Sequence, residues 1–295
     1  TMPWGTKWYN SDSSYEIQEL NDSTYVSIGQ SYNDWDYAPE VPHIFQRNLK
    51  LNLKGSIINE FTLDLSYSGH EGPLRSLLIN EKILIGGRKN DTIDAPFNSL
   101  LTYFNELGNP LWIIDLDNGD NEGIAAVNVK NDTLYFLSNY YVNSGDIAGF
   151  KLYKALLNGS ILDSINFQST KYSSSTDLKF LNDSTILILW NEVDQNDNYK
   201  SKIKVSFLSL NFINLSTIEI WNDLNFENYP SNSLLQLYDN NIFLSGRITD
   251  VVGIQGSKGL IIKTDLNGNE IWQKVYNRSN SPSGIEGFSS IKESE

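Results

Sequence analysis

Two arginines hold corresponding places in the chain and are suited to bind an anionic group. Arg88 follows two glycines, and Arg247 follows Ser245 and Gly246. A guanidinium carries several N–H donors in a planar fork, so such arginines can bind a carboxylate or a sulfate bidentately. The alternative is that each arginine forms an ion pair with a neighbouring acidic side chain. We therefore treat both arginines as candidate ligand-binding residues.

Aromatic and acidic side chains gather in the long segments between the expected strands. Trp35 and Tyr37 lie in one of these segments, and Tyr140 and Tyr141 lie in another. Aromatic planes suit the C–H faces of sugars, and carboxylates accept hydrogen bonds from sugar hydroxyls. The alternative is that these residues are solvated parts of ordinary loops. The predicted ligand-binding residues are Trp35, Tyr37, Arg88, Tyr140, Tyr141 and Arg247.

Two clusters of acidic residues bring several oxygen ligands together. One covers residues 115–122 and includes Asp115, Asp117 and Glu122, and the other covers residues 194–198 and includes Asp194 and Asp197. Hard cations prefer carboxylate and carbonyl oxygens, so calcium is the one cofactor that the sequence suggests. Neither cluster has the full spacing of an EF-hand loop. The alternative is turn chemistry, because Asp and Asn occur in every loop of this chain.

Residues typical of catalytic centres are scarce. His43 and His70 are the only histidines, neither belongs to a nucleophile motif, and the chain has no cysteine. A sialidase-like or lyase-like enzyme would need several arginines converging with a tyrosine or with paired carboxylates. We expect a binding protein rather than an enzyme, and a carbohydrate-active enzyme is the alternative.

Composition excludes several classes of partner and site. The 295 residues carry a formal charge of -14, and the isoelectric point is near 4.6. This charge repels phosphate backbones, so nucleic acid is not expected as a partner. No uninterrupted apolar run is long enough to span a membrane, although 40% of the residues are hydrophobic and can form a core. The absence of cysteine excludes disulfides and thiolate metal sites.

Two kinds of turn recur along the chain and position these candidate residues. The first kind is rich in Asn and Asp and starts at positions 21, 80, 131, 182 and 239. The second kind usually contains glycine, and its reference residues are Gly55, Gly108, Gly159, Leu215 and Gly268. Their spacing of 51 to 56 residues lies in the range of four-stranded propeller blades. The fourth of these turns lacks glycine, so we expect another turn type there.

Short runs of β-branched and aromatic residues between the turns predict strands rather than helices. In the third repeat the expected strands are 125–129, 134–138, 150–156 and 160–167. In the fifth repeat they are 234–238, 242–246, 259–265 and 270–276. Each repeat is a pair of hairpins, because Asn-Asp and Asn-Gly tolerate the positive φ that tight hairpin turns need. The predicted fold class is an all-β propeller of four-stranded blades.

The two ends of the chain look like parts of one further blade. Residues 4–9 are similar to the fourth strand at 272–276, and residues 284–291 take the place of the next first strand. Propellers commonly close by completing one blade with strands from both termini. We expect a single propeller domain over residues 1–295, with five full blades plus the first and fourth strands of another, incomplete at the C-terminus. The alternative is a ring that closes irregularly.

The stretch from Lys263 to Tyr276 resembles the repeat of secreted β-propeller proteins of Bacteroidota. Residues 103–112 are similar to it, and residues 153–167 are similar more weakly. The resemblance extends over nearly the whole chain, but the fourth repeat departs from it. It implies export to a secreted or cell-surface location, often through type IX secretion with a C-terminal sorting domain. Secretion machinery would then be a partner of the chain.

Five short motifs resemble the O-glycosylation motif of the same bacteria, in which Asp precedes Ser or Thr and an apolar residue or Thr follows. The residues that would carry glycans are Ser23, Thr92, Thr133, Ser164 and Ser184. Turn chemistry alone is the alternative, because hairpin turns favour Asn, Asp and Ser.

The long connections are expected to carry the function. In a four-stranded blade, the connection between the second and third strands lies at the same end as the connection to the next blade. We expect a secreted or surface-displayed binding module whose ligand, a glycan or a surface protein, binds at this end. The alternatives are a carbohydrate-active propeller enzyme and a platform subunit of a surface or secretion assembly.

Overall fold

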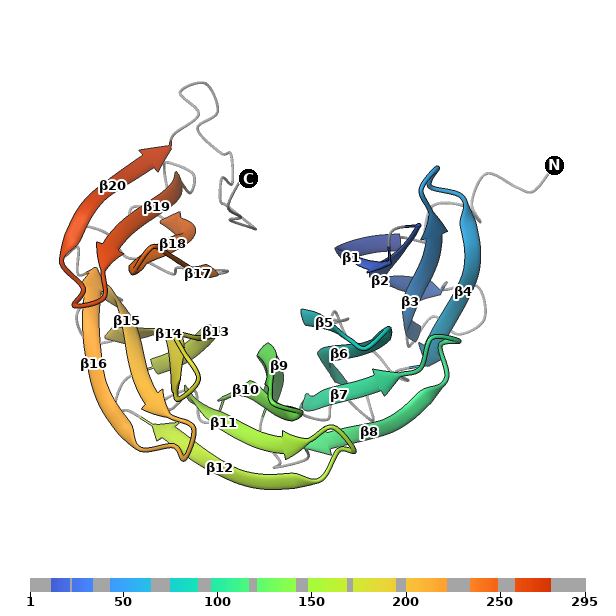
Figure 1. Ribbon diagram of the computed structural model, residues 1–295, viewed down its shortest axis with the longest axis horizontal. Coiled ribbons are helices and arrows are strands. Elements are labelled where there is room, and N and C mark those ends of the chain that lie inside the picture. The colour runs from blue at the N-terminus through green and yellow to red at the C-terminus, as the bar shows by residue number, and fades with distance from the viewer. Residues whose placement is uncertain are drawn as a thin grey trace. The chain divides into compact units, whose positions relative to one another are not determined.

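The structure is a computed structural model of the 295-residue chain. It describes residues 12–21, 23–33, 43–64, 75–89, 97–116, 121–141, 148–168, 172–194, 200–221, 234–248 and 258–276. Within these ranges every regular element is a strand, and the strands form five four-stranded sheets (Figure 1). No helix long and apolar enough to cross a membrane occurs in this part of the chain.

Each sheet consists of four strands that are consecutive in the sequence and adjacent in the sheet. The first sheet contains β1 (Asp12–Asn21), β2 (Thr24–Asn33), β3 (His43–Asn52) and β4 (Ile57–Asp64). The second contains β5 (Arg75–Ile79), β6 (Lys82–Lys89), β7 (Asn98–Phe104) and β8 (Pro110–Leu116). The third contains β9 (Asn121–Lys130), β10 (Thr133–Tyr141), β11 (Ala148–Leu156) and β12 (Ile161–Gln168).

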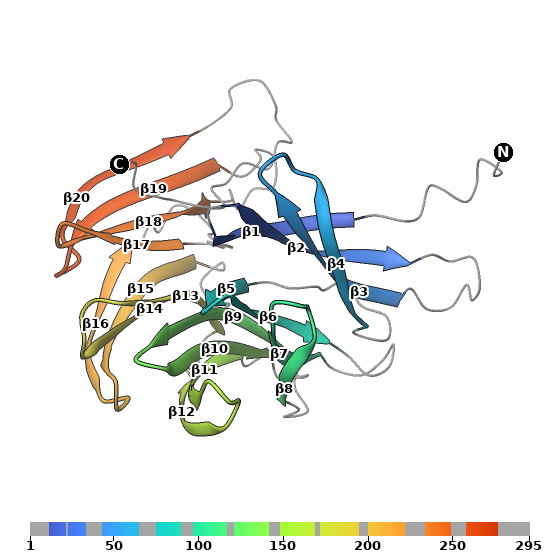
Figure 2. The same cartoon turned by 45° about the vertical axis from the view of Figure 1, so that its right-hand side comes forward.

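The last two sheets follow the same plan. The fourth contains β13 (Tyr172–Phe180), β14 (Thr185–Asp194), β15 (Lys200–Ser209) and β16 (Asn214–Trp221). The fifth contains β17 (Leu234–Tyr238), β18 (Asn241–Ile248), β19 (Lys258–Asp265) and β20 (Glu270–Tyr276), which lie side by side in this order (Figures 1 and 2). The prediction of all-β, four-stranded blades is confirmed. The expected strands at 4–9 and 284–291 lie outside the described residues.

The chain divides into two compact units, which are described separately. Unit 1 contains Thr1–Asn143 and Lys154–Asp163, and unit 2 contains Ser144–Tyr153 and Ser164–Glu295. The first two sheets, together with β9 and β10, belong to unit 1. The fourth and fifth sheets belong to unit 2. The expectation of one domain over the whole chain stays a prediction.

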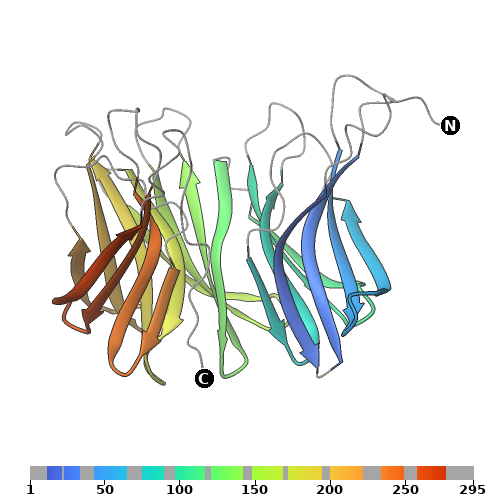
Figure 3. The same ribbon diagram turned by 90° about the horizontal axis from the view of Figure 1, so that it is seen from above.

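Tight turns join the first and second strands of each sheet, as the Asn-rich motifs predict. In three of these turns two consecutive residues have positive φ, and these pairs are Asn80 and Glu81, Asn131 and Asp132, and Asp239 and Asn240. Two consecutive left-handed residues match the right-handed twist of the flanking strands, which is why Asn and Asp are favoured there. Within each unit these turns lie at one end of the sheets (Figure 3).

The turns between third and fourth strands share one hydrogen-bond pattern. Gly55, Gly108, Gly159 and Gly268 all have positive φ in these turns. In the fourth sheet Phe212 takes this place with a φ of 62°, and its N–H donates to the Ser209 carbonyl as the N–H of Gly55 donates to Asn52. The prediction of another turn type centred on Leu215 is therefore wrong. The ring of Phe212 is buried, and the apolar area removed from water offsets the strain of a left-handed non-glycine residue.

The cores lie between neighbouring sheets within each unit. In unit 1, Val26 and Ile28 of β2 pack with Ile83 and Ile85 of β6. In unit 2, a cluster of the same kind joins β14 to β18 and contains Leu187, Leu189, Ile242 and Leu244. In both cases the third and fifth residues of one second strand pack against the second and fourth residues of the next second strand. This follows because side chains alternate between the two faces of a strand.

The first strands of neighbouring sheets also contact one another. In unit 1, β1 contacts β5 and β5 contacts β9, and Arg75 Nε of β5 donates to the Ala125 carbonyl of β9 over 2.9 Å. In unit 2, β13 contacts β17, and Asp177 Oδ2 of β13 accepts a hydrogen bond from the N–H of Leu235 over 3.0 Å. Ala125 lies at a register shift in its strand, which leaves its carbonyl available to Arg75.

Candidate ligand-binding site

Arg88 lies at the end of the second sheet that is opposite to the hairpin turns. It is the penultimate residue of β6 and pairs with Ser99 of β7. Its Cζ lies 4.6 Å from the centroid of the Phe97 ring. A guanidinium over an aromatic face makes a favourable cation–π contact. Phe97 thus holds the positive charge of Arg88 at this end of the sheet.

Glu122 lies beside Phe97 on the neighbouring third sheet. Its N–H donates to the Phe97 carbonyl over 2.6 Å, which joins the start of β9 to the residue just before β7. The Glu122 side chain is only 2% exposed. Burial of a carboxyl group is costly unless polar or charged groups surround it, so Glu122 marks a polar region between these strands.

Tyr140 and Tyr141 end β10 next to the start of β9. Tyr140 pairs with Glu122, and Tyr141 pairs with Asn121. Consecutive strand residues point to opposite faces, and here Tyr140 is buried while Tyr141 is half-buried. Tyr141 is close enough to Arg88 to act on its charge.

The strands that carry this site are held together by a buried pair of hydroxyls. The Ser99 and Ser138 side-chain oxygens lie 2.6 Å apart, and this hydrogen bond joins β7 to β10. Ser99 pairs directly with Arg88, and Ser138 lies two residues before Tyr140. The bond therefore fixes the second and third sheets relative to each other next to the Arg88 site.

Burial governs the electrostatics of Arg88. Removal from water lowers the pKa of Arg88, and the nearby Tyr141 opposes this shift. An arginine remains protonated at physiological pH even when its pKa falls, so the group is a cation partly removed from solvent. Such a cation attracts an anionic or hydroxyl group more strongly than a fully solvated one does.

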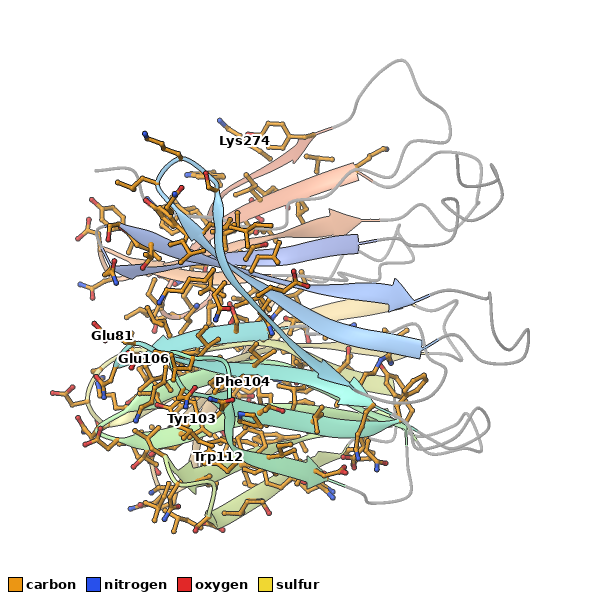
Figure 4. The ribbon with its side chains drawn as sticks, turned by 90° about the vertical axis from the view of Figure 1, so that its right-hand side faces the viewer. Glu81, Tyr103, Phe104, Glu106, Trp112 and Lys274 are labelled. Atoms are coloured by element: carbon orange, nitrogen blue, oxygen red, sulfur yellow. The ribbon has the colours of Figure 1, made fainter. Side chains whose placement is uncertain are left out.

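Charged residues are distributed unevenly along the second sheet. Glu81 and Glu106 lie in the hairpin turns at the end opposite to Arg88 (Figure 4). Lys89 makes an ion pair with Asp115, which joins β6 to β8 near the Arg88 end. Tyr103 and Trp112 lie between the two ends, with ring centroids 5.4 Å apart (Figure 4). Tyr103 is buried and Trp112 is half-buried. The cationic group of the site is thus separated from the acidic turns by the length of the sheet.

Arg88, Phe97, Glu122 and Tyr141 form a group that we call the Arg88 site. It combines a partly desolvated cation, an aromatic ring, a buried carboxyl group and a phenol. These groups can accept and donate hydrogen bonds to a hydroxylated ligand and can neutralise a carboxylate or sulfate on it. Sequence reasoning selected Arg88 and Tyr141 as ligand-binding residues and placed Glu122 in the acidic run 115–122 as part of a possible calcium site. It missed Phe97, which belongs to no motif.

The other predicted ligand-binding residues are placed as follows. Trp35 and Tyr37 lie outside the described residues. Arg247 is the penultimate residue of β18, as Arg88 is of β6, and its backbone pairs with Gly259. The two arginines therefore occupy corresponding backbone positions near the ends of β6 and β18, as the sequence predicts. Arg247 belongs to unit 2 and Arg88 to unit 1.

The predicted calcium clusters are described only in part. Asp117 and Asp197 lie outside the described residues, and Asp115 is the ion-pair partner of Lys89. Asp194 ends β14, where its backbone pairs with Lys200. Among the residues that the structure describes, no group of three or more His, Asp or Glu side chains is placed to hold a metal ion. Calcium binding stays a prediction.

The predicted glycosylation residues that are described lie in turns, at the start of β10 and in β12. Ser23 and Ser184 are exposed, and their hydroxyls donate to Asn21 over 3.0 Å and to Asn182 over 2.9 Å. Thr133 begins β10, and Ser164 is exposed in β12. Thr92 lies outside the described residues.

Unit 2 contains a half-buried ionic group that the sequence did not reveal. Lys204 Nζ of β15 lies 3.1 Å from Glu192 Oε1 and 4.8 Å from the ring centroid of Trp190, both of β14. Trp190 Nε1 donates to Ser206 Oγ over 2.9 Å. Both members of this ion pair are largely removed from water, so loss of either one would leave an uncompensated charge. The group links β14 to β15 within the fourth sheet.

Comparison with known proteins establishes the fold. The sequence matches no known family profile and no curated protein. A solved structure of cobalt-substituted apocarotenoid oxygenase from Synechocystis aligns with a TM-score of 0.51 and 7% identity, over 95% of this chain and 64% of the oxygenase. The α-L-arabinofuranosidase from Fusarium graminearum, solved with an iminosugar inhibitor, aligns with a TM-score of 0.52 and 8% identity, over 95% of this chain and 88% of the enzyme.

These likenesses show a β-propeller built of four-stranded blades. The chain spans less than two thirds of the length of the oxygenase. Identity this low shows the fold alone, because one fold carries many unrelated functions.

Proposed function

We propose that this protein is a carbohydrate-binding propeller whose ligand binds at the Arg88 site. The observation that carries the proposal is the position of the Arg88 guanidinium over Phe97, beside Tyr141 and the buried Glu122. Sugars present apolar C–H faces and hydroxyl groups, which suit an aromatic ring next to charged hydrogen-bonding groups. Long connections at this end of the blades are the usual place for binding groups on a rigid scaffold.

The proposal is tested by glycan-array screening followed by calorimetric titration with the best ligand. Arg88→Ala should weaken binding by about tenfold or more, since it removes a charge-assisted hydrogen-bond donor. Tyr141→Phe should weaken binding less, because only one hydroxyl is lost. Lys54→Ala, in the exposed turn between β3 and β4, is the control and should bind normally. Unchanged affinity in Arg88→Ala would place the ligand elsewhere.

A carbohydrate-active enzyme is the second candidate. The observation in its favour is the buried carboxyl of Glu122 beside a cation and a phenol, since glycosidases use carboxyl groups of raised or lowered acidity. The arabinofuranosidase with the similar fold suggests arabinofuranosides as the first substrates to try. New reducing ends from arabinan that disappear in Glu122→Gln, while ligand binding persists, would favour the enzyme over the binding module.

We also propose a secreted or surface-displayed location, as the Bacteroidota-like repeat implies. Export through type IX secretion and O-glycosylation at Ser23, Thr92, Thr133, Ser164 or Ser184 belong to this proposal. The exposed turn hydroxyls of Ser23 and Ser184 support it, since a glycosyltransferase needs an accessible acceptor. Intact-mass measurement of protein from its native host should show added hexose masses, and a bare polypeptide mass would contradict glycosylation. A pull-down from host membranes tests the platform alternative.

A further inference from the structure

The turn between the third and fourth strands is built differently in the third sheet. In the other four sheets a side-chain acceptor stands at the end of the third strand or directly after it, and these acceptors are Asn52, Asn105, Ser209 and Asp265. Each accepts a hydrogen bond from the backbone N–H four residues further on, as Asp265 Oδ1 does from Asn269 over 2.9 Å. The third sheet has Leu156 at this place, and a leucine side chain has no acceptor.

Asn158 takes over this hydrogen bond in the third sheet. Ser160 lies four residues after Leu156, and its N–H donates to Asn158 Oδ1 over 3.0 Å. The bond closes a short ring of atoms that includes the Gly159 nitrogen, so it holds the side-chain Cγ of Asn158 beside this nitrogen. Such positioning favours a reaction between the two atoms. The donated N–H also stabilises negative charge that develops on Oδ1 when Cγ is attacked.

The attacking group is the backbone nitrogen of Gly159. Attack of the following backbone nitrogen on the amide carbon of an asparagine closes a five-membered ring, and a glycine at this place hinders the attack least because it has no Cβ. Packing favours glycine here, since a Cβ at position 159 would lie 3.0 Å from the Trp112 ring. Gly159 also has a φ of 89°, which residues with a side chain rarely adopt. The turn therefore retains an Asn-Gly pair, and Asn158 is exposed to water.

One hydrogen bond of the turn opposes this reaction. The Gly159 N–H donates to the Leu156 carbonyl over 3.0 Å, and the nitrogen must leave this bond before it can attack. The Asn-Gly pair of the fifth sheet bears the same cost, because the Gly268 N–H donates to the Asp265 carbonyl over 3.1 Å. This bond therefore slows both pairs alike.

The fifth sheet provides a matched comparison. Asn267 is preceded by Leu266 and followed by Gly268, so both turns contain the tripeptide Leu-Asn-Gly. Asp265 Oδ1 accepts from the N–H groups of Asn267 and Asn269 over 2.8 and 2.9 Å. The N–H two residues after Asn267 is thus bound to Asp265 and does not hold the Asn267 amide. The negative charge of Asp265 also opposes loss of a proton from the Gly268 nitrogen.

We propose that Asn158 deamidates spontaneously in the folded protein, and faster than Asn267. The Gly159 nitrogen loses its proton to solvent and bonds to Cγ of Asn158. The bond from Cγ to the amide nitrogen breaks, and this nitrogen takes up a proton and leaves as ammonia. Water then opens the cyclic imide at either of its carbonyl groups, which gives aspartate or isoaspartate. No electrons are transferred, and water is the only co-reactant.

The isoaspartate product would act on a contact between two sheets of unit 1. Isoaspartate adds one carbon to the main chain before Gly159 and so changes the turn. The preceding residue, Leu157, accepts the hydrogen bond from Trp112 Nε1 of β8 over 2.7 Å. The isoaspartate form, separated by ion-exchange chromatography, should therefore unfold at a lower urea concentration than the unmodified chain. An unchanged midpoint would show that the turn accommodates the added carbon and would overturn this consequence.

Peptide mass spectrometry of the 295-residue chain tests the proposal. The folded chain is kept in mildly alkaline buffer, and the deamidated fractions at Asn158 and Asn267 are followed over time. Asn158 should react about fivefold faster, the factor expected from one hydrogen bond in the transition state. In concentrated urea the two rates should be equal, because both turns are lost and the tripeptides are identical.

Two reciprocal substitutions test the cause of the difference. Leu156→Asn supplies the acceptor found in other sheets, so the Ser160 N–H should bind it and the rate at Asn158 should fall to about that at Asn267. Leu156 is 39% exposed, so a polar side chain is tolerated there. Asp265→Leu copies the turn of the third sheet and should raise the rate at Asn267. Circular dichroism checks that both variants are folded.

Three results would overturn the proposal. Deamidation at Asn158 that is no faster than at Asn267 in the folded wild type would show that the turn does not promote the reaction. Deamidation of Asn158 only in urea would show that the fold protects it. An unchanged rate at Asn158 in folded Leu156→Asn would show that the Ser160 hydrogen bond is not the cause. The first two results need no variant, so they hold even if a substitution prevents folding.

Discussion

Asn48 is a polar residue whose buried environment offers its side chain no hydrogen bond. It lies in β3, is fully buried, and neither side-chain polar atom has a hydrogen-bond partner. It pairs with Ile28 of β2. The place of Asn48 is taken by Leu101 in β7 and by Val205 in β15, and both of these residues are apolar. A buried amide that makes no hydrogen bond costs about 1–3 kcal/mol. We predict that Asn48→Leu raises the free energy of unfolding by about this amount.

A second asparagine in the same strand provides the control. Asn52 Oδ1 accepts hydrogen bonds from the N–H groups of Lys54 and Ser56 and so holds the following turn. Asn52→Ala should lower the free energy of unfolding by about 1 kcal/mol, the typical value for such a bond. Urea denaturation should therefore show a higher free energy of unfolding than the wild type for Asn48→Leu and a lower one for Asn52→Ala. A loss of stability in Asn48→Leu would mean that the amide is satisfied by a buried water.

Asp265 makes the stability of one turn depend on pH. Hydrogen bonds from the Asn269 side chain and backbone, and from the N–H of Asn267, lower the pKa of its carboxyl group. The folded-state pKa thus lies below the unfolded one, so the ionised carboxylate stabilises the fold above the unfolded pKa. This contribution is lost as pH falls through the lowered pKa.

Replacement of Asp265 by Asn tests this dependence. Asn52 and Asn105 have the same role in other sheets, so Asp265→Asn keeps the acceptor for the backbone. The wild type should lose more stability than Asp265→Asn in urea titrations between about pH 7 and about pH 3. Equal losses of stability in the wild type and in Asp265→Asn would show that the negative charge of the carboxylate does not stabilise the turn beyond the effect of its acceptor oxygen.

At the scale of elements, two turns with glycine allow the cost of backbone strain to be measured apart from the cost of overpacking. Gly55 and Gly159 both have positive φ, but a Cβ at Gly55 would meet nothing within 4 Å, whereas one at Gly159 would lie 3.0 Å from the Trp112 ring. Trp112 cannot move away without losing its hydrogen bond to Leu157. We predict that Gly55→Ala costs about 1–2 kcal/mol from strain alone.

Gly159→Ala should cost about 1–3 kcal/mol more than Gly55→Ala, because overpacking adds to the strain. Thermal or urea unfolding of both variants measures the difference directly. Gly159→Ala combined with Trp112→Phe should recover part of the additional loss, since the smaller ring gives space for the methyl group. Equal effects of the two alanine substitutions would mean that the Trp112 ring yields without cost.

The elements were predictable where local chemistry sets them. Asn, Asp and Gly mark the turns, so the bounds of β17 and β20 agree with the expected 234–238 and 270–276. Phe212 was missed because its turn is stabilised by burial of its ring, which no local pattern reveals. Glu122 was selected only as part of an acidic run, and its place beside Phe97 was missed because the two residues meet through contact between two sheets. Pairing between strands is predictable from turns, but contacts between sheets depend on side chains far apart in sequence.

At the scale of the whole molecule, net charge and local charge act against each other. The chain carries -14, yet the Arg88 site presents a partly desolvated cation. Polyanionic ligands are therefore repelled at long range, whereas a neutral glycan or a sugar with one acidic group avoids most of this cost. Among glycans of equal size, weakly charged ones should bind best at low ionic strength.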